Sequence, residues 1–530
     1  MSVLRGIELT SFKLILAVAL LALLTAVIAA VLLPRTVPAA TREKAADGPA
    51  RPALRTVLRG VGRYTARTVM VSVPVLLVMV LAGLLINRPM HYVRTVGDVI
   101  EAASPRTQVV SRVTPLPEAS AYDAAPASAW KASFHDAGDG SQEATWTGPV
   151  SGITLPVRVI VPSGYRPDDG RTYNVLEGLH GWVGDPQSLV TGIASPQRLQ
   201  EAIDAGRIPP SILVFPSLNV DGGQPDCVNI AGRPAVGTWT AEEIPRMIQA
   251  TFPNVTTQRA GWMIMGISAG AYCAARTAYD VPQRFGAVGV MSSYDLPGEG
   301  SLAHSGKTLQ AQNGLSTMLG KREPDGMRFY VLGAQDDSSG AARAAWLMDD
   351  AVRKPDSLTV DTPASGGHSW TLWNNYFPSL LTWWGSDPAV FKAAGVTAPQ
   401  GDTWAKATAA GVKPLSETPK DQRVVGSVSP VRARPFEING LGTIIVAVVA
   451  SLGALGAVMF WSPRWGRRRD GGKRSVARLG GAILGRVVVI LVAAGLVAVT
   501  AGIGANASGG FYTSWRDLRA SVRVNERAGK

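Results

Sequence analysis

The chain has 530 residues and a formal net charge of +13, from 52 Lys and Arg against 39 Asp and Glu. Only 17% of the residues are charged and 46% are hydrophobic, which excludes a disordered chain and a coiled coil. Two cysteines allow at most one disulfide, which excludes a disulfide-dense scaffold and a zinc site built from four thiolates.

The basic residues lie at the two ends of the chain. Residues 141–400 contain 18 Lys and Arg against 23 Asp and Glu, a net charge of 18 − 23 = −5. Because this large middle segment is acidic, nucleic acid is not expected as a partner. The basic residues instead flank apolar stretches, a pattern typical of membrane proteins.

Four apolar stretches have the length of a transmembrane helix, about 20 residues. They cover residues 14–33, 69–86, 441–461 and 487–505. We therefore expect an N-terminal membrane region (1–100) and a C-terminal membrane region (438–530), with two transmembrane helices each. Membrane lipid is then an expected partner.

The loops within each pair of spans are strongly basic. Residues 34–68 hold eight Lys and Arg against two acidic residues, and residues 462–486 hold eight against one. The positive-inside rule places both loops in the cytoplasm. We expect a multi-pass protein of the plasma membrane with its middle domain extracytoplasmic. The alternative is a first stretch that acts as a signal peptide, cleaved near residues 37–40, which would invert this orientation.

Residues 145–395 alternate strand and helix signals, between two segments expected to be linkers (101–144 and 396–437). Strands are predicted at 155–161, 173–179, 211–215, 262–267, 287–291, 329–332 and 357–360, with helices between them. This pattern predicts an α/β fold, a mostly parallel sheet with helices on both faces.

The sequence Gly266-Ile267-Ser268-Ala269-Gly270 follows a predicted strand and precedes an Ala-rich helix. This is the strand–turn–helix context of a nucleophile elbow, in which glycines allow a tight turn around the serine. The alternative is a Gly-rich turn with an inert serine.

A nucleophilic serine needs a base and an acid, in the chain order Ser, Asp or Glu, His. His368 lies in a loop of small residues after a predicted strand and is the expected base. Asp336, in the turn after the 329–332 strand, is the expected acid, with its neighbour Asp337 as the alternative.

An oxyanion hole needs two backbone N–H donors. One is expected from Ala269, directly after the nucleophile, and the other from Leu179 or His180 in the loop after the 173–179 strand.

Together these segments resemble the putative-esterase family of α/β-hydrolases, which includes esterase D, enterochelin esterases and mycolyltransferases. The similar segments are His180-Gly181, the Gly266–Gly270 elbow, Gly333-x-x-Asp336, and Gly367-His368-Ser369-Trp370 followed by Trp373 and Pro378. The resemblance covers about half of the chain and implies an α/β-hydrolase fold with Ser268, Asp336 and His368 as nucleophile, acid and base.

The remaining candidates lie close to these motifs. Cys273 follows Ser268 by five residues on the same predicted helix, and Cys227 follows the 211–215 strand, so a disulfide is expected in an oxidising compartment. Trp182 and Trp370 flank motif residues and are candidates for a substrate pocket, with simple packing as the alternative.

The sequence thus predicts a membrane-anchored serine esterase or acyltransferase. The expected substrate is an acyl ester or lipid, with the mycolyltransferase-like case implied by the resemblance. No cofactor and no metal are expected. The alternative is a non-catalytic binding or scaffolding protein that keeps the α/β-hydrolase fold.

Overall fold

A computed structural model describes residues 4, 6–37, 54–90, 93, 95–103, 110, 112–182, 184–220, 226–298, 300–423, 435–465, 476–509, 512, 514–516 and 518–519. The chain divides into two compact units. One is a helical bundle within residues 8–88 and 433–509, and the other is an α/β domain within residues 89–432.

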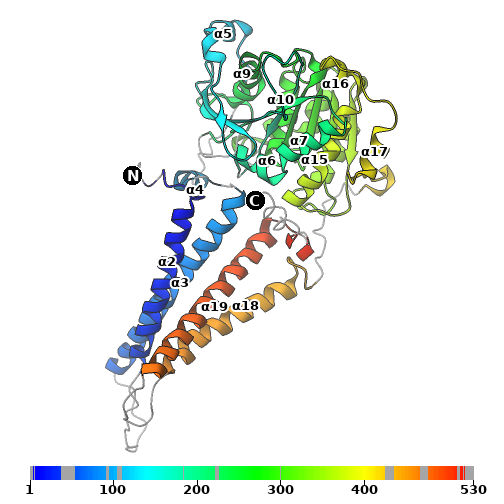
Figure 1. Ribbon diagram of the computed structural model, residues 1–530. Coiled ribbons are helices and arrows are strands. Elements are labelled where there is room, and N and C mark those ends of the chain that lie inside the picture. Colours follow the sequence, from blue (N-terminus) through cyan, green and yellow to red (C-terminus); the bar gives the residue numbers. More distant parts are fainter. Residues whose placement is uncertain are drawn as a thin grey trace, which may run out of the picture. The chain divides into compact units, whose positions relative to one another are not determined.

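The bundle consists of long apolar helices (Figure 1). They are α2 (Phe12–Leu32), α3 (Leu54–Met90), α18 (Leu441–Gly456) and α19 (Val476–Gly509). By length and composition, Phe12–Thr36, Val61–Arg88, Leu441–Arg464 and Val476–Ala507 could each cross a membrane. They coincide with the four predicted stretches and extend each of them. The helices share an apolar core that contains Ala26, Ala30, Val71, Val458 and Ile490.

Two buried arginines join the N-terminal helices of this bundle to the C-terminal ones. Arg67 on α3 donates to Thr36 Oγ1 at 2.7 Å and to the Met459 carbonyl at 3.1 Å. Arg486 on α19 donates to the Ala30 carbonyl at 3.0 Å and to the Ser462 carbonyl at 3.0 Å. Because each guanidinium binds carbonyls at or near helix C-termini in both halves, it satisfies groups that a helix end leaves unpaired.

The α/β domain is built on a nine-stranded sheet in the order β11-β10-β9-β8-β5-β6-β4-β3-β2. The six strands β5, β6, β8, β9, β10 and β11 are parallel, and β4, β3 and β2 are added antiparallel to one another at one edge. Their bounds are β2 (His135–Asp136), β3 (Gln142–Thr147), β4 (Thr154–Ile160), β5 (Asn174–Leu179), β6 (Ser211–Pro216), β8 (Trp262–Ile267), β9 (Ala287–Met291), β10 (Arg328–Leu332) and β11 (Ser357–Asp361).

Helices cover both faces of the sheet, as predicted. One face packs against α9 (Ile244–Thr251), α10 (Ala269–Asp280), α13 (Leu315–Lys321) and α14 (Ala341–Ala351). The other packs against α6 (Pro186–Gly192), α7 (Ser195–Asp204), α15 (Trp370–Gly385) and α16 (Pro388–Ala393). The central strands β5, β6, β8 and β9 are buried throughout, which explains why β6, β8 and β9 read as nearly continuous apolar runs. β5 differs, because it also contains the buried polar residues Asn174 and Glu177.

Both segments expected to be linkers contain ordered structure. Residues 101–144 contribute β1 (Val113–Thr114), α5 (Ala119–Asp123) and β2, and Tyr122 and Trp130 lie in the core of the domain. Residues 396–437 contain α17 (Thr403–Ala409). Both differ from the expectation because isolated aromatic residues, which show no periodicity, are enough to anchor an irregular segment to a core.

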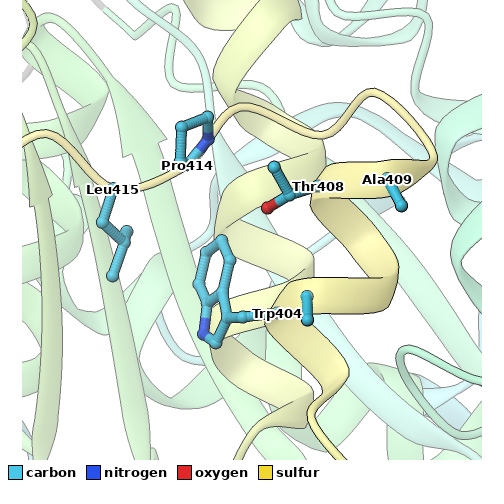
Figure 2. Close-up of a pocket in the computed structure, with 6 residues that line it drawn as sticks. Trp404, Thr408, Ala409, Pro414 and Leu415 are labelled. Carbon is cyan, nitrogen blue, oxygen red and sulfur yellow. The ribbon is translucent and has the colours of Figure 1, made fainter.

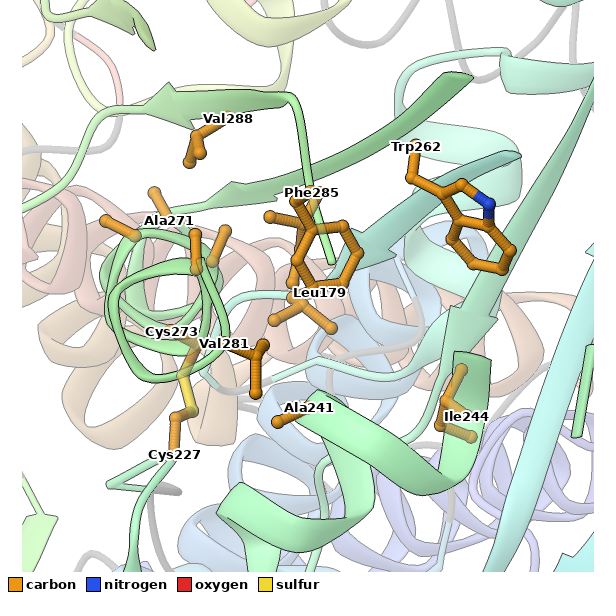
Figure 3. Close-up of a cluster of buried hydrophobic side chains, with 14 of the residues drawn as sticks. Leu179, Cys227, Ala241, Ile244, Trp262, Ala271, Cys273, Val281, Phe285 and Val288 are labelled. Atoms are coloured by element: carbon orange, nitrogen blue, oxygen red, sulfur yellow. A yellow bond between two sulfur atoms is a disulfide. The ribbon is translucent and has the colours of Figure 1, made fainter. Parts of the chain in front are cut away.

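Cys227 and Cys273 form a disulfide with their Cα atoms 5.2 Å apart. Figure 3 shows it at the side of helix α10, within the same apolar layer as Leu179 and Phe285. Cys227 lies two residues before β7 (Asn229–Ile230), which pairs antiparallel with β1. The disulfide therefore ties the helix after Ser268 to the segment that follows β6.

Candidate active site

Ser268 lies in the sharp turn between β8 and α10. Its backbone has φ 57° and ψ −121°, in a region that non-glycine residues rarely adopt. The Ser268 amide donates to the Met291 carbonyl at 2.9 Å, at the end of neighbouring strand β9. The turn thus has the strained geometry of a nucleophile elbow.

The two glycines of the elbow are required by close backbone contacts. A Cβ atom at Gly266 would lie 1.9 Å from the Gly270 carbonyl oxygen, and a Cβ atom at Gly270 would lie 2.1 Å from the Leu179 carbonyl oxygen. No side chain fits at such distances. Glycine at both positions therefore lets α10 begin directly against the end of β5.

Ser268, His368 and Asp337 form a continuous line of hydrogen bonds. The Ser268 hydroxyl lies 2.8 Å from Nε2 of His368, and Nδ1 of His368 lies 2.9 Å from Oδ2 of Asp337. The three residues follow β8, β11 and β10, whose carboxyl ends meet at one edge of the parallel sheet. This is the arrangement in which a histidine can take the serine proton while a carboxylate holds the imidazole.

Asp336, the residue expected to be the acid, binds the backbone of the loop that carries His368. Its Oδ1 accepts from the Gly367 amide at 2.8 Å, whereas its neighbour Asp337 faces the imidazole. The choice of Asp336 over Asp337 therefore does not fit the geometry. Adjacent residues point in different directions after a strand, so a single step in the turn decides which carboxylate reaches the histidine.

Asp337 is buried but well supplied with donors. Oδ1 accepts from the Ser339 amide at 2.8 Å and from the Ser339 hydroxyl at 2.6 Å. Burial acts to raise the pKa of Asp337, but the charge of His368 and the hydrogen bonds from His368 and Ser339 outweigh it, so the pKa is lowered. The carboxylate therefore stays charged opposite the imidazole.

His180 supports the loop after β5 through its side chain. Nε2 accepts from the Leu218 amide at 2.9 Å, so Nδ1 carries the proton and donates to the Gly181 carbonyl at 2.8 Å. Burial lowers the pKa of His180 to about 4, although the Gly181 hydrogen bond acts in the opposite direction. At neutral pH this neutral imidazole joins the β5 loop to the segment after β6.

Gly181 is the residue of this loop that approaches the nucleophile. A Cβ atom there would lie 3.3 Å from the Ser268 Cβ and 3.8 Å from the Ser268 hydroxyl oxygen. Leu179 is the last residue of β5, paired with Gly266, and Ala269 is the first of α10. All three predicted oxyanion-hole residues thus belong to the two segments that meet at Ser268.

The tryptophans near the site differ in exposure. Trp182 is half-buried. Trp370 is buried, and it fills the space where a side chain at Gly192 would otherwise lie. The rings of Trp370 and His368 both lie edge-to-face with Trp373, at 5.1 Å between centroids. Trp370 therefore packs behind the histidine, which fits the packing alternative better than a place in an open pocket.

Several supporting residues were not predicted from the sequence. Trp373 donates from its indole N–H to the Ser292 hydroxyl at 3.0 Å, and Ser292 has a positive φ of 59° at the end of β9. Ser339 had one available signal, because Asp-x-Ser at the start of a helix often forms a side chain–backbone turn. Ser292 had none, since its role depends on a partner 81 positions away.

The sheet order, the elbow and the placement of the three side chains define this unit as an α/β-hydrolase domain. Residues 151–383 match the family model described as "Putative esterase". The resemblance noted in the sequence is therefore confirmed for this segment. No curated protein matches the chain.

Three of the solved structures that the chain is similar to are as follows. A ferulic acid esterase is 18% identical, with a TM-score of 0.40, and covers 46% of this chain and 96% of its own. An S-formylglutathione hydrolase from Agrobacterium tumefaciens is 16% identical (TM-score 0.38; 48% and 97% covered). FphF, a fluorophosphonate-binding serine hydrolase from Staphylococcus aureus, is also 16% identical (TM-score 0.36; 46% and 97% covered).

Proposed function

We propose that the protein is a membrane-anchored serine esterase that acts on acyl esters on the outer side of the plasma membrane. The observation that carries this proposal is the hydrogen-bonded line from Ser268 through His368 to Asp337 at a strained elbow. The match to an esterase family over residues 151–383 supports the same reaction class.

In the first half of the reaction, Ser268 would attack the ester carbonyl while Nε2 of His368 takes the hydroxyl proton. The imidazolium formed would be stabilised by the carboxylate of Asp337, 2.9 Å from Nδ1. His368 would then give this proton to the leaving alcohol as the carbonyl–oxygen bond breaks. The products of this half are an acyl-serine and a free alcohol.

The negative oxygen of the tetrahedral intermediate needs donors on the side of Ser268 that faces the β5 loop. We assign them to the Ala269 amide and to an amide of Leu179 or His180. Ala269 begins α10, so its N–H is not used within the helix. One such donor is typically worth about 3 kcal/mol in the transition state.

In the second half, His368 would remove a proton from an acceptor hydroxyl, which attacks the acyl-serine and releases Ser268. Water as acceptor gives hydrolysis, and a sugar hydroxyl gives a mycolyltransferase-like acyl transfer. Incubation of the membrane fraction with a lipid acyl donor and trehalose separates the two. Free acid as the only product indicates hydrolysis, and a new trehalose ester indicates transfer.

The orientation rests on the two basic loops. The carbonyl contacts of Arg67 and Arg486 bring the ends of helices beside both loops together at one end of the bundle. This supports the expectation that both loops lie on the same side of the membrane. With four crossings, the segment between the second and third crossing lies on the opposite side, which we assign to the exterior.

The test uses the full-length protein purified in detergent with p-nitrophenyl butyrate as substrate. We expect Ser268→Ala to lower kcat by a factor on the order of 10^6. Ser163→Ala, which changes an exposed serine outside the site, serves as the matched control and should keep most of the activity. If Ser268→Ala retains most of its turnover, the serine assignment is wrong, and if the wild type neither turns over esters nor reacts with a fluorophosphonate, the domain is a non-catalytic scaffold.

A further inference from the structure

Residues 412–423, which we call the strap, run along the edge of the sheet after helix α17. The Thr362 amide, directly after β11, donates to the Ser416 carbonyl, and the Ser416 amide donates to Oδ1 of Asp361 at 2.9 Å. Ser379 on α15 donates to the Lys413 carbonyl at 2.8 Å. The strap is thus bonded to the last strand and to the helix that follows it.

Thr418 is the residue of the strap that reaches the catalytic loops. Its hydroxyl lies 2.8 Å from the Thr362 hydroxyl and accepts from the side-chain amide of Gln335 at 3.0 Å. The same Gln335 amide donates to the Thr362 carbonyl at 3.0 Å. Thr418 and Thr362 are both buried, so these hydrogen bonds are shielded from water and costly to leave unmade.

Gln335 and Thr362 stand at the start of the two loops that carry the acid and the base. Gln335 lies two residues before Asp337. Its backbone N–H donates to the Pro363 carbonyl at 2.9 Å. Thr362 begins the loop that leads to His368. Thr418 therefore holds the two loops to each other at the base of the Asp337–His368 hydrogen bond.

The strap is itself fixed at both ends. Arg423 donates to Asp349 on α14 at 2.8 Å and to the Thr418 carbonyl at 3.1 Å. At the other end, Pro414 and Leu415 face Trp404 and Thr408 of α17 across an open apolar pocket of about 480 Å³ (Figure 2). This pocket includes none of the candidate site residues, and the strap is fixed at this end by the Ser379–Lys413 hydrogen bond.

We propose that the strap is a working part of the active site and that Thr418 is a positioning residue for the Asp337–His368 pair. This inference rests on the proposed esterase function. The strap lies beyond residues 151–383, the segment that matches the family model, so it is an addition to the family-matched segment.

The experiment measures p-nitrophenyl butyrate turnover and fluorophosphonate labelling of the full-length protein. Thr418→Val keeps the shape but removes the hydroxyl, and Thr418→Ser keeps the hydroxyl. Gln335→Met removes the same hydrogen bond from the acid-loop side, together with the direct bond from Gln335 to the Thr362 carbonyl. Thr257→Val, at an exposed position before β8, is the control for a Thr-to-Val change away from the strap.

We expect Thr418→Val and Gln335→Met each to lower kcat about tenfold with KM unchanged, because a displaced loop affects the reaction and not substrate binding. Thr418→Ser and Thr257→Val should stay within twofold of the wild type. The Thr418→Val/Gln335→Met double variant should lose little more than either single one.

The inference is overturned if Thr418→Val and Gln335→Met keep the wild-type kcat, whatever happens to their thermal stability. If Thr418→Val does not fold, Thr418→Ala, which also removes the hydroxyl, decides by the same criterion. Failure of the proposed function looks different, because the wild type itself would then be neither active nor labelled.

Discussion

Two neighbouring carboxylates hold the loop of His368 at different points. Asp337 binds the imidazole through Nδ1, and Asp336 binds the backbone amide of Gly367, where φ is 59°. Asp337 is therefore placed to stabilise a positive charge that forms on the histidine. The hydrogen bond of Asp336 to Gly367 instead fixes the path of the loop.

We therefore predict opposite outcomes for two similar substitutions. Asp337→Asn should lower kcat by a factor on the order of 10^4, because an amide favours the wrong tautomer of the histidine. Asp336→Asn keeps an oxygen that can accept from Gly367 and should lower kcat by less than about tenfold. Steady-state turnover of p-nitrophenyl butyrate decides, and the reverse ranking would restore Asp336 as the acid.

Asp361, the last residue of β11 and a partner of the strap, gives a second prediction at the level of one residue. Asp361 accepts from the Tyr330 hydroxyl at 2.7 Å and from the Ser416 amide, and burial raises its pKa to about 6. A raised pKa means that the folded protein binds the proton of Asp361 more tightly than the unfolded chain does. The stabilising contribution of protonated Asp361 is therefore complete below about pH 4 and is lost as the pH rises through 6.

Asp361→Asn should therefore be more stable relative to the wild type at pH 7 than at pH 4. The change in that difference should be on the order of 3 kcal/mol, since two pKa units correspond to about that energy. Chemical unfolding of both proteins at the two pH values measures it. The difference between the proteins is the relevant quantity, because His180, with its lowered pKa, gives the wild type an opposite slope. A pH-independent difference would contradict the prediction.

At the scale of elements, the disulfide joins α10 to the segment before β7 across 46 residues. Closing a loop of that length restricts the unfolded chain and typically stabilises a protein by about 3–4 kcal/mol. The same segment contains Leu218, whose amide binds His180.

Replacing both cysteines by alanine should therefore lower the free energy of unfolding by about 3 kcal/mol. Chemical denaturation measured by tryptophan fluorescence provides the readout. With a reductant present throughout, the wild type and the double variant should unfold at nearly the same denaturant concentration. A variant as stable as the oxidised wild type would show that the disulfide has no stabilising role.

The parallel strands and the elbow could be predicted because each depends on a short, local sequence pattern. Strands Trp262–Ile267 and Ala287–Met291 occur at the residues expected, since buried strands read as apolar runs. The strap and the start of the domain were missed because Thr418, Tyr122 and Trp130 act through partners far away in sequence. The preference for Asp336 over Asp337 differs from the geometry for a similar reason, because the turn after β10 fixes which aspartate faces His368.

At the scale of the whole molecule, the two pairs of apolar helices form a single bundle. Arg67 and Arg486 each bind carbonyls in both halves. A lysine preserves the positive charge that directs membrane insertion but cannot donate several hydrogen bonds in a fixed plane. Substitution by lysine therefore separates the two roles of these arginines.

We predict that Arg67→Lys and Arg486→Lys insert normally but destabilise the bundle by on the order of 3 kcal/mol, because each loses at least one charged hydrogen bond. Arg63→Lys, an exposed position on the same helix, is the control and should behave as the wild type. The measurement is the thermal unfolding of the detergent-purified proteins. Equal midpoints for Arg67→Lys and Arg63→Lys would show that only the charge matters.

The central claim is that a reactive serine faces the outside of the cell. Intact cells that express the protein are treated with a membrane-impermeant fluorophosphonate, alongside cells that carry the Ser268→Ala variant and a parallel lysed sample. The account predicts equal labelling of the wild type in intact and lysed cells, and none of Ser268→Ala. Labelling only after lysis would contradict the orientation, and no labelling in either sample would contradict the enzyme.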